Sequence, residues 1–244
     1  MNRFPHEFSE LLTPYGKRVL KGEAEDVSSL FINSRKYFVN LNKVINKSAA
    51  RECAVLLEKH LHKHLSIEQR KIEADSITGM IENYSETLSK TMRIRTAFLK
   101  RRTARSYRAA ERIGLLRMMQ SESFTRFVEA VTGLKLDYDL SLQVICYEQG
   151  DYSGPHNDHH PEEETIREGY IDFHVMFPNE AVAHQYLVYE EKRHFSRIVD
   201  VNVPGGVSIY KLPFWHYTTP LAGKPGRERE ARRWLLLGTY RILD

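Results

Sequence analysis

A change from helical to strand periodicity is clearest in the stretch Ser141-Leu142-Gln143-Val144-Ile145-Cys146-Tyr147. β-branched, apolar and aromatic residues dominate this run, and the turn-forming sequence Glu148-Gln149-Gly150-Asp151 follows it. A short apolar run that is bounded by turn residues is typical of a buried strand. We therefore expect a strand over residues 141–147.

Similar strand patterns recur through the C-terminal half of the chain. They cover residues 171–177, 207–210 and 234–240. Two further runs, 185–190 and 195–203, flank the charged sequence Glu191-Lys192-Arg193-His194, which predicts a hairpin. Several short strands with turn signals between them favour a sandwich or a barrel over alternating β-α units.

The N-terminal half has the spacing of apolar residues that predicts helices. Expected helices cover residues 30–45, begin at Ser48, and begin again at Ser66, where Gln69 completes a capping box. A further helix with apolar residues from Phe124 to Val131 should end at Gly133. This pattern divides the chain into a helical support region, residues 1–135, and a strand-rich core, residues 136–244, within one integrated α+β domain.

The composition excludes several classes of protein. The chain has 244 residues and a net charge of +4, which alone does not indicate a nucleic-acid partner. No apolar run approaches the roughly 20 residues that span a bilayer, so no membrane partner is expected. The two cysteines, Cys53 and Cys146, cannot form a disulfide framework, and no secretory signal is recognisable. We expect a cytoplasmic protein.

A candidate metal site follows the first strand. In an extended chain, residues two apart point to the same side, so His156 and Asp158 could offer a nitrogen and an oxygen to one ion. His216, in an aromatic segment, is the best third ligand; His160 and His174 are alternatives, although His174 is expected to face away. Two histidines and one carboxylate suit non-heme Fe(II), but the same ligands could hold zinc in a hydrolase.

The sequence from Leu142 through His156 and Asp158 resembles the prolyl-4-hydroxylase-like branch of the Fe(II)/2-oxoglutarate-dependent oxygenases. The resemblance continues through the turn at 203–207 to the segment beginning at His216 and a basic residue on the last strand. It covers about residues 120–244. It implies a double-stranded β-helix, or jelly roll, buttressed by N-terminal helices, and a hydroxylase that uses Fe(II), 2-oxoglutarate and O2.

The resemblance also implies roles for single residues. It assigns the iron to His156, Asp158 and His216, and contact with 2-oxoglutarate to Tyr147. The far carboxylate of 2-oxoglutarate would pair with Arg233 or, alternatively, Arg232, because a guanidinium binds both carboxylate oxygens at once. We prefer Arg233, since its face of the strand continues through apolar residues.

The substrate is not specified by these motifs. A small molecule such as an amino acid or biosynthetic intermediate is the first expectation, and a peptidyl side chain is the second. A nucleic-acid demethylase would need the arginines at 101, 105, 108 and 112 to bind phosphates, whereas we expect a solvated face. A cupin-like metal-binding module without turnover is the non-enzymatic alternative.

Overall fold

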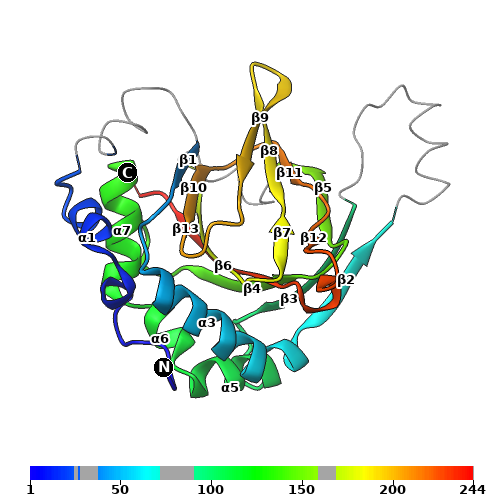
Figure 1. Cartoon of the computed structure of the whole chain (residues 1–244). Helices are drawn as coiled ribbons and strands as arrows, with labels where there is room; N and C mark the ends of the chain where they lie inside the picture. Colours follow the sequence, from blue (N-terminus) through cyan, green and yellow to red (C-terminus); the bar gives the residue numbers. More distant parts are fainter. Residues whose placement is uncertain (25–26, 28–37, 72–90, 159–168, 244) are drawn as a thin grey trace.

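Among the residues that the structure describes, eleven strands form one antiparallel sheet that curls into a barrel (Figure 1). The computed structural model describes residues 1–24, 27, 38–71, 91–158 and 169–243. Ten strands follow one another across the sheet, in the order β1 (Phe38–Leu41), β10 (Val207–Lys211), β6 (Tyr170–Pro178), β13 (Arg233–Arg241), β4 (Ser141–Tyr147), β3 (Met92–Phe98), β5 (Tyr152–His156), β11 (His216–Thr218), β8 (Tyr186–Glu191) and β9 (His194–Asp200). The eleventh, β2 (Ser66–Arg70), pairs with β3, and β12 (Ala222–Gly223) pairs with β7 (Val182–His184) in a separate two-stranded sheet. The fold is α+β with a jelly-roll barrel, as the sequence predicts.

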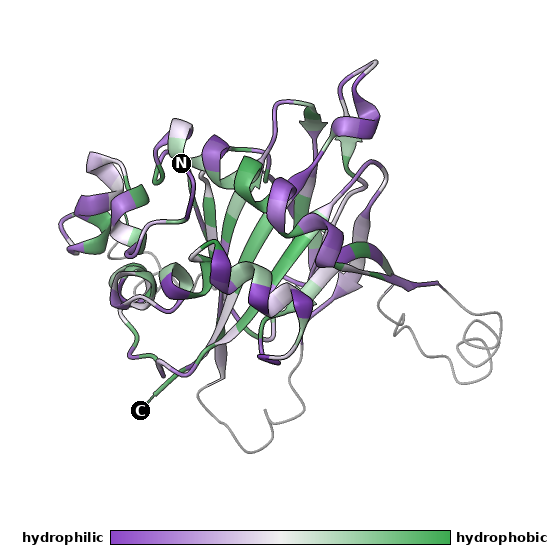
Figure 2. Cartoon of the chain, turned by 90° about the horizontal axis from the view of Figure 1, so that it is seen from below, coloured by the Kyte–Doolittle hydropathy of each residue, from purple (hydrophilic) through white to green (hydrophobic). Residues whose placement is uncertain are grey.

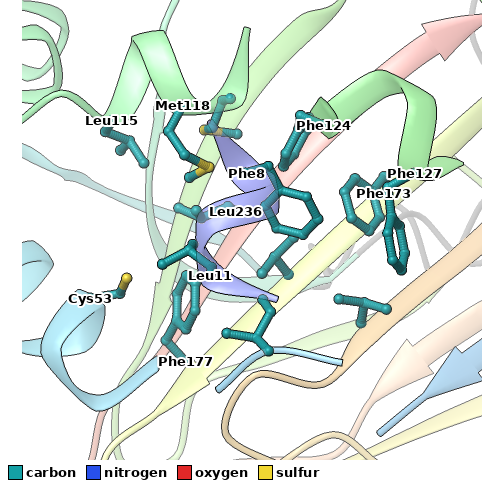
Figure 3. Packing of buried hydrophobic residues seen from close by; sticks show 14 of the residues in the cluster. Phe8, Leu11, Cys53, Leu115, Met118, Phe124, Phe127, Phe173, Phe177 and Leu236 are labelled. Carbon is teal, nitrogen blue, oxygen red and sulfur yellow. The ribbon is translucent and has the colours of Figure 1, made fainter. Parts of the chain in front are cut away.

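Helices cover the outer face of the sheet (Figures 1 and 2). They are η1 (Phe8–Leu11), α1 (Pro14–Leu20), α3 (Lys47–His60), η2 (His62–His64), α5 (Arg105–Arg112), α6 (Leu115–Met119) and α7 (Glu122–Thr132), with η4 (Glu228–Glu230) near the last strand. Figure 3 shows the apolar layer between helices and sheet, where Phe8 meets Phe124, Phe127 and Phe173 edge-on. Burial of this layer stabilises the packing of the helices on the sheet.

Alternation along the strands divides the side chains between two environments. On β6, Phe173, Val175 and Phe177 belong to the core beneath the helices. The intervening residues His174 and Met176 line the interior of the barrel instead. Because successive strand residues point to opposite faces, this single strand supplies both the packing core and the cavity wall.

The structure confirms the predicted strands of the C-terminal half. Strand β4 spans Ser141–Tyr147, and the hairpin of β8 and β9 turns at Lys192 and Arg193. Both turn residues have positive φ, 54° and 68°, as a two-residue hairpin turn of this hand requires. Helix α3, with Asn46 as its N-cap, and helix α7, ended by Gly133 at φ 72°, are confirmed as well.

The helical interpretation of other N-terminal segments was wrong. Residues 38–41 form β1 and residues 66–70 form β2, both expected to be helical. Strand β3, residues 92–98, also lies before residue 136 and pairs with β4, so the sheet draws on both sides of the expected boundary. Other parts of these two predicted helices, residues 30–37 of the first and those from 72 onward of the second, lie outside the described residues. The capping-box pattern failed at Ser66 because pairing with β3 satisfies the same backbone groups in an extended chain.

Within the described part of the chain, no helix combines the length and the apolar character needed to cross a bilayer.

Candidate metal centre and adjoining cavity

Two histidines face each other across a pair of neighbouring strands. His156 is the last residue of β5 and His216 is the first residue of β11, and the two are direct partners in the antiparallel register. Their ring centroids lie 4.2 Å apart, and both residues are buried. Strand pairing therefore brings together side chains that are 60 residues apart in the sequence.

The hydrogen bonds of the two rings define which nitrogen faces the site. His156 Nδ1 lies 2.6 Å from the Gly154 carbonyl oxygen, and His216 Nδ1 lies 2.7 Å from that of Phe214. Because a carbonyl oxygen can only accept, each Nδ1 carries the hydrogen and donates it. In the neutral form of each ring, Nε2 then carries the lone pair that binds a metal.

Asp158 completes the group. Its Oδ1 lies 3.3 Å from His156 Nε2, and its Oδ2 lies 3.6 Å from His216 Nε2. One ligand atom from each of the three residues lies within 4.8 Å of the other two. Asp158 reaches this place from a left-handed backbone conformation, φ 51°, which aspartate tolerates better than most residues. The extended geometry expected for this tripeptide was therefore wrong in detail, since the chain turns after His156.

The donor set fits an iron ion. Two imidazole nitrogens and one carboxylate on one side of a site leave the remaining positions open for other ligands, an arrangement typical of non-heme Fe(II). Of the alternative ligands, His174 is not part of the group. Its Nε2 lies 3.0 Å from the Tyr210 hydroxyl, and it lines the cavity rather than facing away as expected. His160 and the neighbouring His159 lie outside the described residues.

One cavity of about 360 Å³ inside the barrel contains both the three-residue group and Arg233. Arg233 is the first residue of β13, and it is 2% exposed. Its Cζ lies 4.4 Å from the centre of the Tyr147 ring, and its Nε donates to Gln185 Oε1 at 2.6 Å. Burial lowers the pKa of Arg233, although arginine stays charged in proteins. Among the described residues, no carboxylate forms a salt bridge with it.

The neighbouring Arg232 lies on the other side of the strand. Its Nε is 3.2 Å from Glu148 Oε1, within a group of ionisable side chains that also includes His62 and Arg95. Burial alone would raise the pKa of Glu148, but hydrogen bonds from Arg95 and His62 and the charge of Arg232 outweigh it and lower the pKa. Arg232 is therefore part of an ion-pair network outside the cavity.

The cavity wall around Arg233 differs from the wall toward Thr239 at the other end of β13. Near Arg233 the cavity is apolar, with Ile145, Met176 and Leu235 among its lining residues. Farther along the barrel the lining becomes polar, with Gln143, Asp172, His174, Ser208 and Thr239. On β13, Arg233 and Thr239 mark the two ends of the cavity. They are six positions apart along the strand, which corresponds to about 20 Å.

Sequence reasoning missed several of these residues. Gln185 is fully buried and holds Arg233, and Tyr210 is fully buried beside His216. Both stand in short segments without a recognisable motif, and only the inward alternation of β10 could have indicated Tyr210. The predicted arginine stripe is exposed, and its last three members, Arg105, Arg108 and Arg112, lie on α5.

Comparison with known proteins finds the same fold in several solved structures. No protein-family model and no curated protein matches the sequence. Three solved structures illustrate the likeness. A prolyl hydroxylase from Trichoplax adhaerens, in complex with a peptide fragment of the oxygen degradation domain of hypoxia inducible factor, is 12% identical with a TM-score of 0.53, over 94% of this chain and 93% of that one. The non-heme alpha ketoglutarate dependent epimerase SnoN from nogalamycin biosynthesis is also 12% identical, with a TM-score of 0.52, over 89% and 82%. The non-heme monooxygenase ThoJ, in complex with nickel, is 14% identical with a TM-score of 0.51, over 89% and 77%. At these identities, the likeness concerns the fold.

Proposed function

We propose that this chain is an Fe(II)- and 2-oxoglutarate-dependent dioxygenase that hydroxylates an unactivated C–H bond of a small molecule. One observation carries the proposal. A single cavity contains a two-histidine, one-carboxylate group and a buried arginine that forms no salt bridge with the described residues. A buried cation without a carboxylate partner is costly, so a bound dicarboxylate would stabilise it.

Each of these residues has a task in this account. His156, Asp158 and His216 would hold the iron, which with 2-oxoglutarate and O2 supplies the oxidising power for C–H hydroxylation and yields succinate and CO2. Arg233 binds the far carboxylate of 2-oxoglutarate through its fork of N–H groups. Tyr147 packs its ring on the Arg233 guanidinium and places its hydroxyl 3.2 Å from Ser153 Oγ. Apolar side chains such as Leu235 exclude water from this end.

The cavity itself supports a small polar substrate. Its volume of about 360 Å³ lies near the lower end of the roughly 300–1,000 Å³ that is usual for small-molecule sites. The polar wall toward Thr239 includes Gln143, Ser208 and Thr239, whose side chains donate to Thr96, Asn40 and Asp172 and keep oxygen lone pairs that can accept from a substrate. Such a wall suits an amino acid or a similar biosynthetic intermediate better than an apolar side chain. The two buried free cysteines support a reducing, cytoplasmic setting.

Three other functions make different predictions. A peptidyl hydroxylase is the second candidate, because the Trichoplax enzyme with this fold is found with a peptide. A nucleic-acid demethylase would need the exposed arginines of α5, a helix that lies outside the barrel (Figure 1). A cupin-like binding module without turnover would leave the position of Arg233 unexplained.

Turnover assays test the proposal. Purified protein with Fe(II), 2-oxoglutarate and O2 should form succinate faster when the correct substrate is added. We expect free amino acids and related polar metabolites to stimulate succinate formation, and prolyl peptides not to do so. If only peptides stimulated succinate formation, the small-molecule substrate would be wrong and a peptidyl hydroxylase would be favoured. If no condition gave iron-dependent succinate formation, the enzymatic proposal would be contradicted.

A further inference from the structure

Gln185 connects the arginine end of the cavity with the strands that carry the two histidines. It stands between β7 and β8, is fully buried, and is not among the residues that line the cavity. Its Oε1 accepts the Nε–H of Arg233 at 2.6 Å. Its Nε2 donates to the carbonyl oxygens of Thr219 at 2.9 Å and Asp151 at 3.2 Å.

The partners of Gln185 determine how its amide is oriented. Two carbonyl oxygens can only accept, so the NH2 group must face Thr219 and Asp151. Arg233 can only donate, so the amide oxygen must face the guanidinium. Both N–H bonds of this side chain and one lone pair of its oxygen are thus used, and rotating the amide would break all three hydrogen bonds at once.

The two carbonyl groups belong to the segments that position the metal ligands. Asp151 immediately precedes β5, which ends at His156, and Thr219 immediately follows β11, which begins at His216. Gln185 therefore ties Arg233 to both strands and fixes how far the guanidinium lies from the three-residue group. Because the Nε–H of Arg233 is taken by Gln185, the Nη groups are left for a carboxylate.

We propose that Gln185 is a positioning residue that sets the length of the 2-oxo dicarboxylate this site accepts. The inference rests on the proposed function, since it requires 2-oxoglutarate to span the metal site and Arg233. A guanidinium held at a fixed place favours the five-carbon cosubstrate over its six-carbon homologue, 2-oxoadipate. Without Gln185, Arg233 can shift. The affinity for 2-oxoglutarate then falls, and the affinities for the two acids become more similar.

Anaerobic isothermal titration calorimetry with Fe(II)-loaded protein measures this without turnover. We titrate 2-oxoglutarate and 2-oxoadipate into the wild type, Gln185→Met, Gln185→Glu and the surface control Gln120→Met. Gln185→Met should bind 2-oxoglutarate about 10- to 100-fold more weakly, because a hydrogen bond to a charged group is lost. Its preference for 2-oxoglutarate over 2-oxoadipate should narrow, while Gln120→Met matches the wild type. Gln185→Glu, which keeps the side-chain shape, should bind both acids weakly because its carboxylate pairs with Arg233.

The outcomes separate the two claims. Equal weakening for both acids in Gln185→Met, with the preference unchanged, would show a merely structural role and overturn the inference. Unchanged affinity in both Gln185 variants would also overturn it and leave the proposed function standing. A wild type that binds no 2-oxoglutarate would contradict the proposed function instead. Thermal melting identifies any variant that does not fold, and if Gln185→Met fails, retained affinity in Gln185→Glu overturns the inference.

Discussion

Arg232 and Arg233 are adjacent in the chain, yet their guanidinium groups lie on opposite sides of the sheet. Arg233 is buried over the Tyr147 ring inside the cavity, whereas Arg232 pairs with Glu148 outside it. This relationship places one cation, and not the other, where it could bind a cosubstrate.

The first prediction separates these two arginines. Arg233→Ala should cost on the order of 3–5 kcal/mol in 2-oxoglutarate binding, because a desolvated carboxylate would lose its cation. That loss corresponds to a rise of roughly two to three orders of magnitude or more in the apparent Michaelis constant for 2-oxoglutarate. Arg233→Lys should be intermediate, because it keeps the charge but loses the fork. Succinate formation over a wide range of 2-oxoglutarate concentrations measures these changes.

Arg232→Ala is the matched control for this experiment. It should leave the apparent constant for 2-oxoglutarate close to that of the wild type. A defect in Arg232→Ala with none in Arg233→Ala would contradict the assignment. If neither variant had an effect, the cupin-like alternative would become the better account.

The sequence predicted the barrel better than the helical half. Strands such as β4 and β13 are buried on both faces or alternate clearly, so their local pattern agrees with the final fold. Segment 38–41 alternates in burial but is only four residues long, and segment 66–70 is largely exposed, so pairing with β10 and β3 makes them strands. Long-range pairing of this kind is not encoded in local periodicity.

The residues of the candidate site could likewise be predicted from local sequence only in part. The motif residues His156, Asp158 and His216 could be selected from spacing and context. Gln185 could not, because its importance arises from three hydrogen bonds to segments distant in sequence. The left-handed backbone conformation of Asp158 could not be predicted either, since the residues of this tripeptide give no local signal for a turn.

A second prediction concerns the metal ligands. His156→Ala, Asp158→Ala and His216→Ala should each abolish iron binding or turnover while the barrel stays folded, since each removes one ligand from a site with three. Elemental analysis after reconstitution with Fe(II) measures this, with the exposed His194→Ala as control. Full iron content and activity in His216→Ala would contradict the assignment of His216 and indicate His160 or His174 as the third ligand.

A third prediction uses the ion-pair network around Glu148. The folded protein lowers the pKa of Glu148 below its usual 4.5, so its charged form stabilises the fold above that pH. The contribution is lost as pH falls through the lowered value. Glu148→Gln should therefore reduce the free energy of unfolding at pH 7 by about 1–3 kcal/mol, because the partly buried Arg95 and Arg232 keep only a neutral acceptor in place of the carboxylate.

Thermal or urea unfolding as a function of pH tests this assignment. The difference between wild type and Glu148→Gln should shrink as the pH is lowered below 4.5, where Glu148 of the unfolded chain becomes protonated, and be lost once the pH passes the lowered pKa, where the folded protein is protonated as well. The exposed Glu230→Gln, which breaks an ion pair with Arg227, should change stability little at any pH. A difference that is constant with pH would contradict the role given to the Glu148 charge.

A fourth prediction concerns the exposed arginines. Changing Arg101, Arg105 and Arg108 together to Gln should leave turnover of a small substrate intact, because these side chains lie outside the cavity. A gel-shift series at rising salt concentration should show no tight binding of nucleic acid by the wild type. Tight, salt-sensitive binding that the triple variant loses would favour a nucleic-acid substrate.

The central claim is that the three-residue group and Arg233 together hold iron and 2-oxoglutarate. Anaerobic titration of the Fe(II)-loaded protein with 2-oxoglutarate tests it most directly. The account predicts a weak visible charge-transfer band that grows with 2-oxoglutarate and saturates in stoichiometric proportion to the protein. Iron binding without any such band, at concentrations of 2-oxoglutarate far above those of the protein, would contradict it.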